Sequence, residues 1–269
     1  MEFGAPPARE LDVDIGDAEA AFYEENGFLA VARITTDEEV EWLRGVYDAL
    51  LAMPATGYLD GMFDLSRPYG TTDMPKLGQL LLPERYVPQI QQTVMWRNAR
   101  RIASRLLKVV EPKLESWCHL IFKDANSSAE TPWHQDEAYW DVHKQFHALA
   151  TWLPLDDVDT NNGCLWYVPG SHRGAVLPHR HGGNDPRVHV LEFNEPVDTS
   201  AGVPIPLAAG GMTFHQSRTF HYSGVNTTNR VRRAWGTAFQ TEPVIRDTPV
   251  DHPWWHDGKK AHAEGLAKR

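Results

Sequence analysis

The amino-acid sequence predicts a mainly β fold: an antiparallel double-sheet barrel of jelly-roll type, with N-terminal helices packed outside it. Two observations support this prediction. Hydrophobic residues recur at helical spacing only before about residue 110. After Pro112, short runs rich in β-branched and aromatic residues alternate with turn signals such as Asn161-Asn162-Gly163. A chain of 269 residues has room for one large barrel domain.

Three helices are expected in the N-terminal part of the chain. The first spans residues 18–26 and ends near Gly27. The second begins after Thr36, because a threonine followed three residues later by Glu39 is the capping-box pattern. The third is expected from about Pro88 to Leu107, since proline is tolerated at the first position of a helix.

The other boundaries separate a tail, a loop region and a barrel core. Residues 1–14 are expected to form a flexible tail, and residues 53–83 form a loop region marked by glycine and proline. Residues 15–269 are then a single domain. Its helical part, barrel core and C-terminal extension are expected at residues 15–110, about 112–245 and 246–269. Strands of the core are expected at residues 116–123, 146–155, 163–168, 187–193, 211–215, 218–222 and 231–241.

The composition is that of an acidic globular protein, with 42% hydrophobic and 23% charged residues. A net charge of −10 argues against nucleic acid as a partner, because phosphate backbones require a basic face. The two cysteines, Cys118 and Cys164, build no disulfide framework. We find neither a secretory signal nor the ~20 apolar residues of a membrane span. We therefore expect a cytoplasmic protein with no membrane partner; the oligomeric state is left open.

The first chemical motif is His134-Gln135-Asp136. In an extended segment, residues two apart point to the same face, so this imidazole and this carboxylate can reach one metal ion. His-x-Asp alone is a weak signal, because it arises often by chance. A second imidazole is needed, and His221 can supply it, since a late strand of a jelly roll can lie beside an early one. His215 is the rival for this role, but it lacks the Ser-Gly-x-Asn continuation that follows His221.

Two histidines and one carboxylate on one face form the metal site of non-haem iron(II) oxygenases, which leaves three coordination positions open. Two positions suit the keto-acid group of 2-oxoglutarate, and the third admits dioxygen. Arg232 fits this interpretation. In the expected strand 231–241 it shares a face with small residues, and an arginine there can bind a carboxylate through two parallel hydrogen bonds. The alternative is an outward-facing surface arginine, like its neighbours Arg230 and Arg233.

These motifs, in their order and spacing, resemble the phytanoyl-CoA dioxygenase family across roughly residues 15–245. The combination of Asn-Gly-x-Leu with Pro-Gly-Ser-His is the most specific part. One departure is Gly210-Gly211, where the family often has Gly-Asp. The segments that carry the resemblance are His134-x-Asp136, Trp152-Leu153-Pro154-Leu155-Asp156-Asp157, Asn162-Gly163-Cys164-Leu165, Val168-Pro169-Gly170-Ser171-His172, His221-Tyr222-Ser223-Gly224-Val225-Asn226 and Arg232-Arg233-Ala234-Trp235.

The resemblance implies a double-stranded β-helix, a cupin-like barrel, and iron(II)- and 2-oxoglutarate-dependent oxidation of an unactivated carbon. It implies that His134, Asp136 and His221 bind iron and that Arg232 anchors the distal carboxylate of 2-oxoglutarate. It also gives roles around the co-substrate to four further residues: Ser223, Trp152, His119 and Lys76. Halogenating relatives replace the metal carboxylate with a small residue, so the presence of Asp136 argues against halogenation.

Two other functions are compatible with the same barrel. A divalent-metal hydrolase or isomerase needs only the facial ligands and a metal-bound water, but it gives Arg232 no task. A non-catalytic small-molecule-binding barrel would retain the fold, although degenerate relatives usually lose a ligand. The acidic chain favours a small metabolite over an acyl-CoA, in natural-product tailoring, and the loop regions 53–83 and 172–205 are expected to shape its pocket. His179, His181 and His189 are interpreted as members of a solvated loop.

Overall fold

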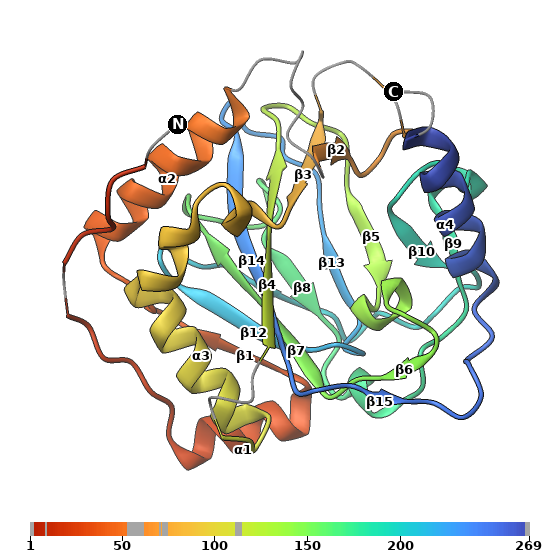
Figure 1. Ribbon diagram of the computed structural model, residues 1–269, viewed down its shortest axis with the longest axis horizontal. Coiled ribbons are helices and arrows are strands. Elements are labelled where there is room, and N and C mark those ends of the chain that lie inside the picture. The colour runs from red at the N-terminus through yellow and green to blue at the C-terminus, as the bar shows by residue number, and fades with distance from the viewer. Residues whose placement is uncertain are drawn as a thin grey trace.

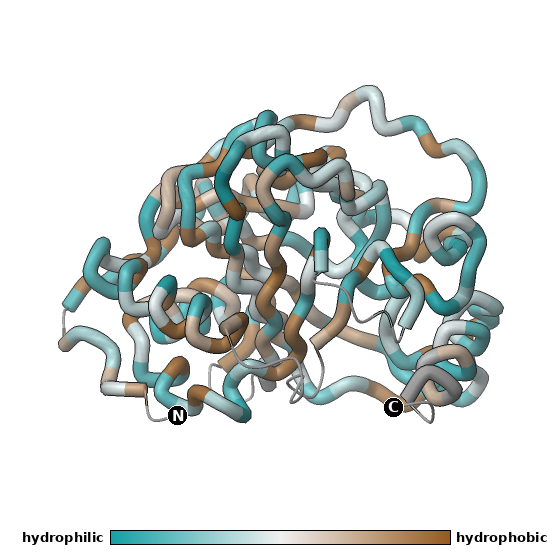
Figure 2. The backbone as a smooth tube through the Cα atoms, turned by 90° about the horizontal axis from the view of Figure 1, so that it is seen from above, coloured by the Kyte–Doolittle hydropathy of each residue, from teal (hydrophilic) through white to brown (hydrophobic). Residues whose placement is uncertain are grey.

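A computed structural model describes residues 3–8, 10–52, 62–69, 71, 75–110 and 115–266. Two antiparallel sheets face each other, and three helices lie against the larger sheet while a fourth lies at the opposite side of the molecule (Figure 1). Hydrophobic residues are concentrated along the central strands, whereas the outer loops are mainly hydrophilic (Figure 2). The predicted mainly β class, with jelly-roll sheets and N-terminal helices outside, is confirmed.

The larger sheet has seven strands in the order β1-β12-β7-β14-β4-β3-β2. Its long central strand β14 pairs with β4 on one side and with β7 on the other. The bounds of its strands are β1 (Phe28–Val31), β12 (Met212–Gln216), β7 (Ala148–Pro154), β14 (Arg232–Gln240), β4 (Glu115–Lys123), β3 (Leu77–Leu81) and β2 (Met62–Asp64).

The smaller sheet has four strands in the order β11-β8-β13-β5. Their bounds are β11 (Val203–Ile205), β8 (Leu165–Tyr167), β13 (His221–Ser223) and β5 (Thr131–His134). Two further pairs of strands lie outside both sheets: β9 (His179–His181) with β10 (Leu191–Phe193), and β6 (Lys144–Gln145) with β15 (Val244–Ile245).

The helices are α1 (Asp17–Asn26), α2 (Asp37–Leu51), α3 (Val94–Leu106) and α4 (Pro253–Leu266). Short 3-10 turns include η3 (Pro88–Gln92) and η5 (Asp136–Tyr139). Within the described residues, no helix combines the length and the apolar character that crossing a bilayer requires.

Strand β14 shows how the sheet separates a hydrophobic core from a polar interior. Alternate side chains of a strand point to opposite faces. Trp235 and Phe239 are fully buried in the main hydrophobic cluster, together with Leu43 of α2 and Ile102 of α3. The other face of β14 presents Arg232, then small residues, into the barrel. The helices therefore complete the core on the outside and leave the inner face for polar groups.

The capping signal before α2 is confirmed and has a second role. The Thr36 hydroxyl accepts a hydrogen bond from the Glu39 backbone N–H at 3.2 Å. The Glu39 carboxylate is only 1% exposed and accepts from the backbone N–H groups of Val94 and Met95, at 2.7 and 2.8 Å. Because a carboxylate at a helix N-terminus satisfies free N–H groups and favours the helix dipole, Glu39 fastens α3 to α2.

The expected helix from Pro88 to Leu107 is wrong in its first turn. Residues 88–92 form the 3-10 turn η3, and α3 begins only after Thr93, whose hydroxyl accepts from the Trp96 backbone N–H at 3.1 Å. A threonine side chain that can cap the backbone favours a new helix start over continuation. Apolar residues continue at helical spacing across this break, so the pattern did not indicate that a new helix begins there.

Several short strands were not predicted. The expected loop 53–83 contains β2 and β3, which extend the larger sheet beyond β4. Strands β1, β5, β9 and β11 have three or four residues each, too few for a periodic pattern to stand out. The C-terminal extension 246–269 contains α4, which was also not predicted.

The tail assigned to residues 1–14 has no helix or strand in its described part, but it lies along α3. Asn98 of α3 donates to the Leu11 carbonyl at 2.8 Å, and its own side-chain oxygen accepts from the Val13 backbone N–H at 3.4 Å. The flexibility of this segment therefore stays a prediction.

Candidate metal centre and its cationic neighbour

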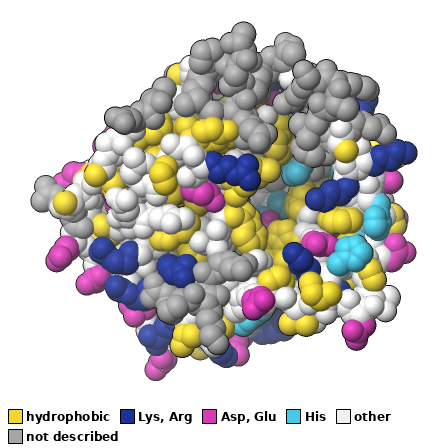
Figure 3. All heavy atoms as spheres, in the orientation of Figure 1, with side chains coloured by type: hydrophobic (Ala, Val, Ile, Leu, Met, Phe, Trp, Pro, Cys, Tyr) yellow, Lys and Arg dark blue, Asp and Glu magenta, His cyan; other side chains and the backbone are white. Residues whose placement is uncertain are grey.

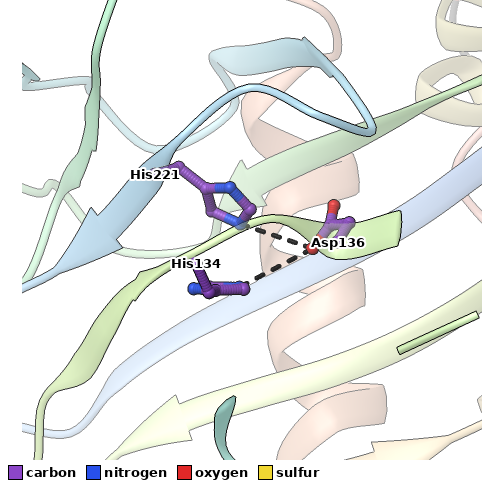
Figure 4. Close-up of side chains that lie close together, drawn as sticks. All are labelled: His134, Asp136 and His221. Carbon is purple, nitrogen blue, oxygen red and sulfur yellow. Dashed lines mark ion pairs between the residues drawn. The ribbon is translucent and has the colours of Figure 1, made fainter. Parts of the chain in front are cut away.

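Two imidazoles and one carboxylate converge between the sheets (Figure 4). His134 of β5 and His221 of β13 are direct cross-strand partners, with ring centroids 4.0 Å apart. Asp136 begins η5, with one residue between it and the end of β5. Its Oδ1 lies 3.7 Å from His134 Nε2 and 3.4 Å from His221 Nε2. One possible ligand atom of each residue lies within 4.8 Å of those of the other two. The sequence-predicted triad is therefore brought together.

Both imidazoles are held in one orientation by backbone carbonyls. His134 Nδ1 lies 2.8 Å from the Pro132 carbonyl oxygen, and His221 Nδ1 lies 3.0 Å from the Thr219 carbonyl oxygen. A carbonyl can only accept, so each Nδ1 carries the hydrogen and each Nε2 keeps its lone pair for a metal. The His134 and His221 side chains are both buried.

The electrostatics of the centre favour an ionised carboxylate at Asp136 and a neutral imidazole at His134. Burial lowers the pKa of His134, and neighbouring His221 lowers it further. Burial by itself would raise the pKa of Asp136, but the imidazoles of His221, His134 and His215 outweigh it and hold this pKa well below its ordinary range. Two imidazole nitrogens and one anionic oxygen are the donor set of a divalent-metal centre with open positions.

His215, the rival imidazole, lies behind the carboxylate instead of completing the triad. Its Nε2 is 3.0 Å from Asp136 Oδ2, the oxygen that faces away from the other imidazoles. Its Nδ1 lies 3.0 Å from the Tyr167 hydroxyl, which in turn lies 2.8 Å from the Thr213 hydroxyl. This chain fixes the carboxylate so that Oδ1 points to the metal position.

Gln135 lies between the two ligands His134 and Asp136, and its side chain points to the opposite side. It fixes the backbone where β5 ends and η5 begins. Its side chain is fully buried and hydrogen-bonds to the backbones of Ala175, Leu177 and Arg218. Its own backbone N–H donates to His179 Nε2 at 3.2 Å. His179 is thus a buried part of the support and not the member of a solvated loop that we expected. No pattern in the sequence indicates this, because the segment around His179 is rich in glycine and proline.

A cationic region lies at the end of β4 and β14. Arg232 is only 2% exposed, which excludes the surface alternative. Its guanidinium lies 5.3 Å from the centre of the Trp152 ring, and its Nε has no hydrogen-bond partner among the described residues. Burial lowers the pKa of Arg232 to about 10. A buried, planar cation with an unsatisfied donor suits a carboxylate ligand.

Lys123, which is opposite Arg232 in the strand register, adds a second buried cation that the sequence analysis missed. Its Nζ donates to the carbonyl oxygens of Ala129, Ser223 and Gly224, at 3.1, 2.9 and 2.6 Å. Burial holds the pKa of Lys123 well below its ordinary value, and Arg232 lowers it further. The amine therefore ties β4 to β13, while Arg232 donates from Nη1 to the Ile121 carbonyl at 3.4 Å.

The other sequence-predicted residues lie at different distances from this region. His119 of β4 is opposite Gly236, and its ring occupies the space that a side chain there would fill. Burial lowers the pKa of His119 to about 4, while nearby Asp136 raises it. The Ser223 hydroxyl donates to the Gly163 carbonyl at 2.9 Å. Lys76 is half exposed, with its Nζ 2.7 Å from Asp124 Oδ2, so its predicted contact rests on the resemblance alone.

A double-stranded β-helix that carries a facial centre of two histidines and one carboxylate defines the class of non-haem iron oxygenases. Comparison with known proteins agrees, because residues 23–234 match the profile of the phytanoyl-CoA dioxygenase family. The chain belongs to the phytanoyl-CoA dioxygenase family.

Solved structures and curated proteins support this placement. A crystal structure of EvdO2 from Micromonospora carbonacea var. aurantiaca is 38% identical and has a TM-score of 0.81, covering 91% of this chain and 99% of that one. EvdO2 complexed with 2-oxoglutarate has a TM-score of 0.79 at 35% identity, with the same coverage. The peroxisomal phytanoyl-CoA dioxygenase of Rattus norvegicus is 27% identical over 231 residues, which are 79% of this chain. The match spans only 64% of the length of that relative.

Proposed function

We propose that this chain is an iron(II)- and 2-oxoglutarate-dependent dioxygenase that hydroxylates an unactivated C–H bond of a small metabolite. One observation carries the proposal. The same barrel holds a three-ligand metal centre and, on the facing sheet, a buried arginine without an anionic partner among the described residues. The first suits iron(II) with three open positions, and the second suits the distal carboxylate of 2-oxoglutarate.

His134, Asp136 and His221 would hold the iron. When bound there, iron(II) supplies the oxidising chemistry: dioxygen gives one oxygen atom to the substrate hydroxyl and one to succinate, as 2-oxoglutarate releases carbon dioxide. The residues of this chain hold the metal-binding side chains in place. The carbonyls of Pro132 and Thr219 fix both imidazoles, and His215 occupies the second oxygen of Asp136. Oδ1 of Asp136 is thus the carboxylate oxygen that would bind the metal.

Arg232 would bind the distal carboxylate of the co-substrate. The Trp152 ring beneath its guanidinium supports the planar group in one orientation, as bidentate binding requires. We assign Trp152 and His119 to the walls of the co-substrate pocket, because both face the small residues of β14. Ser223 closes the pocket beside the carbonyls that hold Lys123. Complex formation of the 35%-identical EvdO2 with 2-oxoglutarate supports this assignment.

The rival functions leave features of the structure without a purpose. A metal hydrolase or isomerase needs no buried arginine, and an arginine without a counter-ion lowers stability. A binding barrel without catalysis has no need for all three metal ligands. The substrate is proposed to be a small metabolite, as in natural-product tailoring, because the chain carries ten more negative than positive charges and so offers little attraction to a polyanionic carrier such as CoA.

The proposal is tested by reconstituting the purified protein with iron(II), 2-oxoglutarate and ascorbate and measuring succinate. We expect succinate that depends on iron(II) and dioxygen, is absent with zinc(II), and increases when a substrate is present. A matched sample of Asp136→Ala controls for non-enzymatic decay of 2-oxoglutarate. Succinate at the same rate in both samples, or turnover of a candidate substrate with zinc(II) alone, would show the proposal to be wrong.

A further inference from the structure

A cavity of about 210 Å³ is lined by residues of the turn η5 and of the helix α4. Ala138 and Tyr139, from the turn η5 that begins with the ligand Asp136, form part of its lining. The Tyr139 ring meets the His134 imidazole edge-on, with ring centroids 5.8 Å apart. Tyr139 is therefore both a lining residue of the cavity and a neighbour of a metal-binding imidazole. Figure 3 shows that this face of the molecule is hollowed, and that histidine and hydrophobic side chains lie together in the hollow.

The C-terminal helix α4 closes the outer side of this cavity. The Trp254 indole N–H donates to the Ala138 carbonyl at 3.0 Å, and the Trp254 carbonyl lies 2.9 Å from His181 Nε2. Gly258 allows the helix to approach, because a side chain there would lie 2.8 Å from the His181 ring. The first turn of α4 is therefore fastened to η5 and β9. Trp255 and Lys259, one turn apart, line the cavity.

The remaining walls are flat and mainly apolar. Tyr139 and His189 stack at 5.3 Å with an interplanar angle of 17°, and Phe63 lies 4.8 Å from the same His189 ring. Tyr69 and Leu191 complete this side. Both loop regions expected to shape a pocket, 53–83 and 172–205, contribute. Aromatic faces around a small volume favour a planar or ring-shaped apolar group, and the volume is below the ~300 Å³ of a typical drug-sized pocket.

The charges of the cavity have one sign. Among its described lining residues there is no aspartate or glutamate, and Lys259 is the one lysine or arginine. Its Nζ lies 5.3 Å from the centre of the Trp255 ring, at the exposed edge of the cavity. In a chain with a net charge of −10, such a cation at a pocket mouth discriminates in favour of an acidic group.

We propose that this cavity binds the substrate, that the substrate is a small ring-bearing molecule with an acidic group, and that Trp255 and Lys259 of α4 select it. The ring would lie between Trp255 and the Tyr139–His189 pair, and the acidic group would meet Lys259. This inference rests on the proposed function for its catalytic meaning, but not for the binding itself. It assigns substrate selection to a helix beyond residues 23–234, the part that matches the family profile.

Binding is tested in metal-free protein without 2-oxoglutarate, with 2-naphthoate and its neutral counterpart 2-naphthamide as probes, by calorimetry or ligand-observed NMR. We expect 2-naphthoate to bind about threefold more tightly than the amide, as for a solvent-exposed ion pair. Lys259→Gln should abolish this preference, whereas Lys260→Gln, an exposed neighbour on the same helix, should preserve it. Trp255→Leu should weaken both probes about tenfold. Circular dichroism and thermal melting establish that each variant is folded.

A preference that survives Lys259→Gln, or that is lost equally in Lys260→Gln, would contradict the assignment of Lys259. Unchanged binding in folded Trp255→Leu would contradict the cavity as the binding site. These results are independent of the proposed function. Probe binding as expected, combined with no iron-dependent succinate, would reject the proposed dioxygenase activity and support the binding site. Iron-dependent succinate without probe binding would support the activity and reject this cavity as the binding site.

Discussion

The two halves of the site differ in how complete they are. At the metal centre, each imidazole has a carbonyl on Nδ1, and the carboxylate has His215 on its second oxygen. At the cationic region, Lys123 donates to three carbonyls, but Arg232 keeps an unsatisfied Nε. The first half is organised by the protein alone. The second half keeps one buried donor without a partner among the described residues, and for this reason we propose it as the anion-binding half.

The largest effect should come from the metal centre. His221→Ala should abolish iron binding and iron-dependent succinate formation, since two ligands do not make a facial site. Iron content of the reconstituted protein and succinate yield measure this. His256→Ala removes an exposed histidine of α4 and serves as the control. Full iron content in His221→Ala would mean that another residue, such as His215, completes the site.

Replacing the unsatisfied cation should separate the two halves. Arg232→Met should weaken 2-oxoglutarate binding on the order of 100-fold, because a buried bidentate ion pair is lost. Iron binding should not change. The ligand-free variant should melt at a higher temperature than the native protein, since a buried charge without a counter-ion is replaced by an apolar side chain. Calorimetric titration and thermal melting test this; a lower melting temperature would show that Arg232 has an anionic partner within the chain.

A smaller effect is expected behind the carboxylate. His215→Phe should reduce metal affinity about 10- to 100-fold, because an outer partner of a metal-binding carboxylate is removed. The affinity for 2-oxoglutarate should change little. His215→Gln can still donate to Asp136 and should recover part of the metal affinity. If Phe and Gln variants bind the metal equally, the hydrogen bond to Asp136 Oδ2 is not what positions the carboxylate.

Acid should destabilise both halves through one histidine from each. Burial lowers the pKa of His179, behind the metal centre, to about 3 and that of His119, on β4, to about 4. Both folded-state values lie below the ordinary 6.5, so the unfolded chain binds more protons between pH 6.5 and these values. Stability is therefore complete above pH 6.5 and is lost as pH falls, by about 2 kcal/mol per histidine at pH 5.

Urea unfolding of metal-free protein at pH 7.5 and pH 5 measures this loss. His119→Asn should remove about half of the part that the two histidines contribute, while the exposed His256→Asn should remove none. If His119→Asn and His256→Asn lose the same stability between pH 7.5 and pH 5, the acid sensitivity comes from other groups.

The sequence predicted the candidate metal-binding residues and the buried Arg232 better than the residues that hold them in place. The continuation after His221 distinguished it from His215, and small neighbours on one face of the strand placed Arg232 inside. Both inferences used local patterns that the fold preserves. Lys123 gave no such signal, because a lysine that ends an apolar strand normally reaches solvent, and its burial depends on carbonyls from residues about 100 positions away.

The C-terminal helix shows the same limit. Its first turn, Pro253-Trp254-Trp255, has no periodic stripe long enough to predict a helix with a defined buried face. The helix is fixed by long-range bonds from Trp254 to Ala138 and His181. Pairings of this kind are decided by the assembled barrel, and so the outer wall of the cavity could not be derived from the chain alone.

The direct pairing of His134 with His221 couples the metal to strand assembly. Because side chains alternate along a strand, a slip of β13 by one residue would turn the second imidazole outward and leave a two-ligand site. Metal uptake would therefore report correct alignment of the sheet during folding. A barrel that closed in the wrong register would stay metal-free, and the bound ion would hold only the properly aligned chain in its folded state.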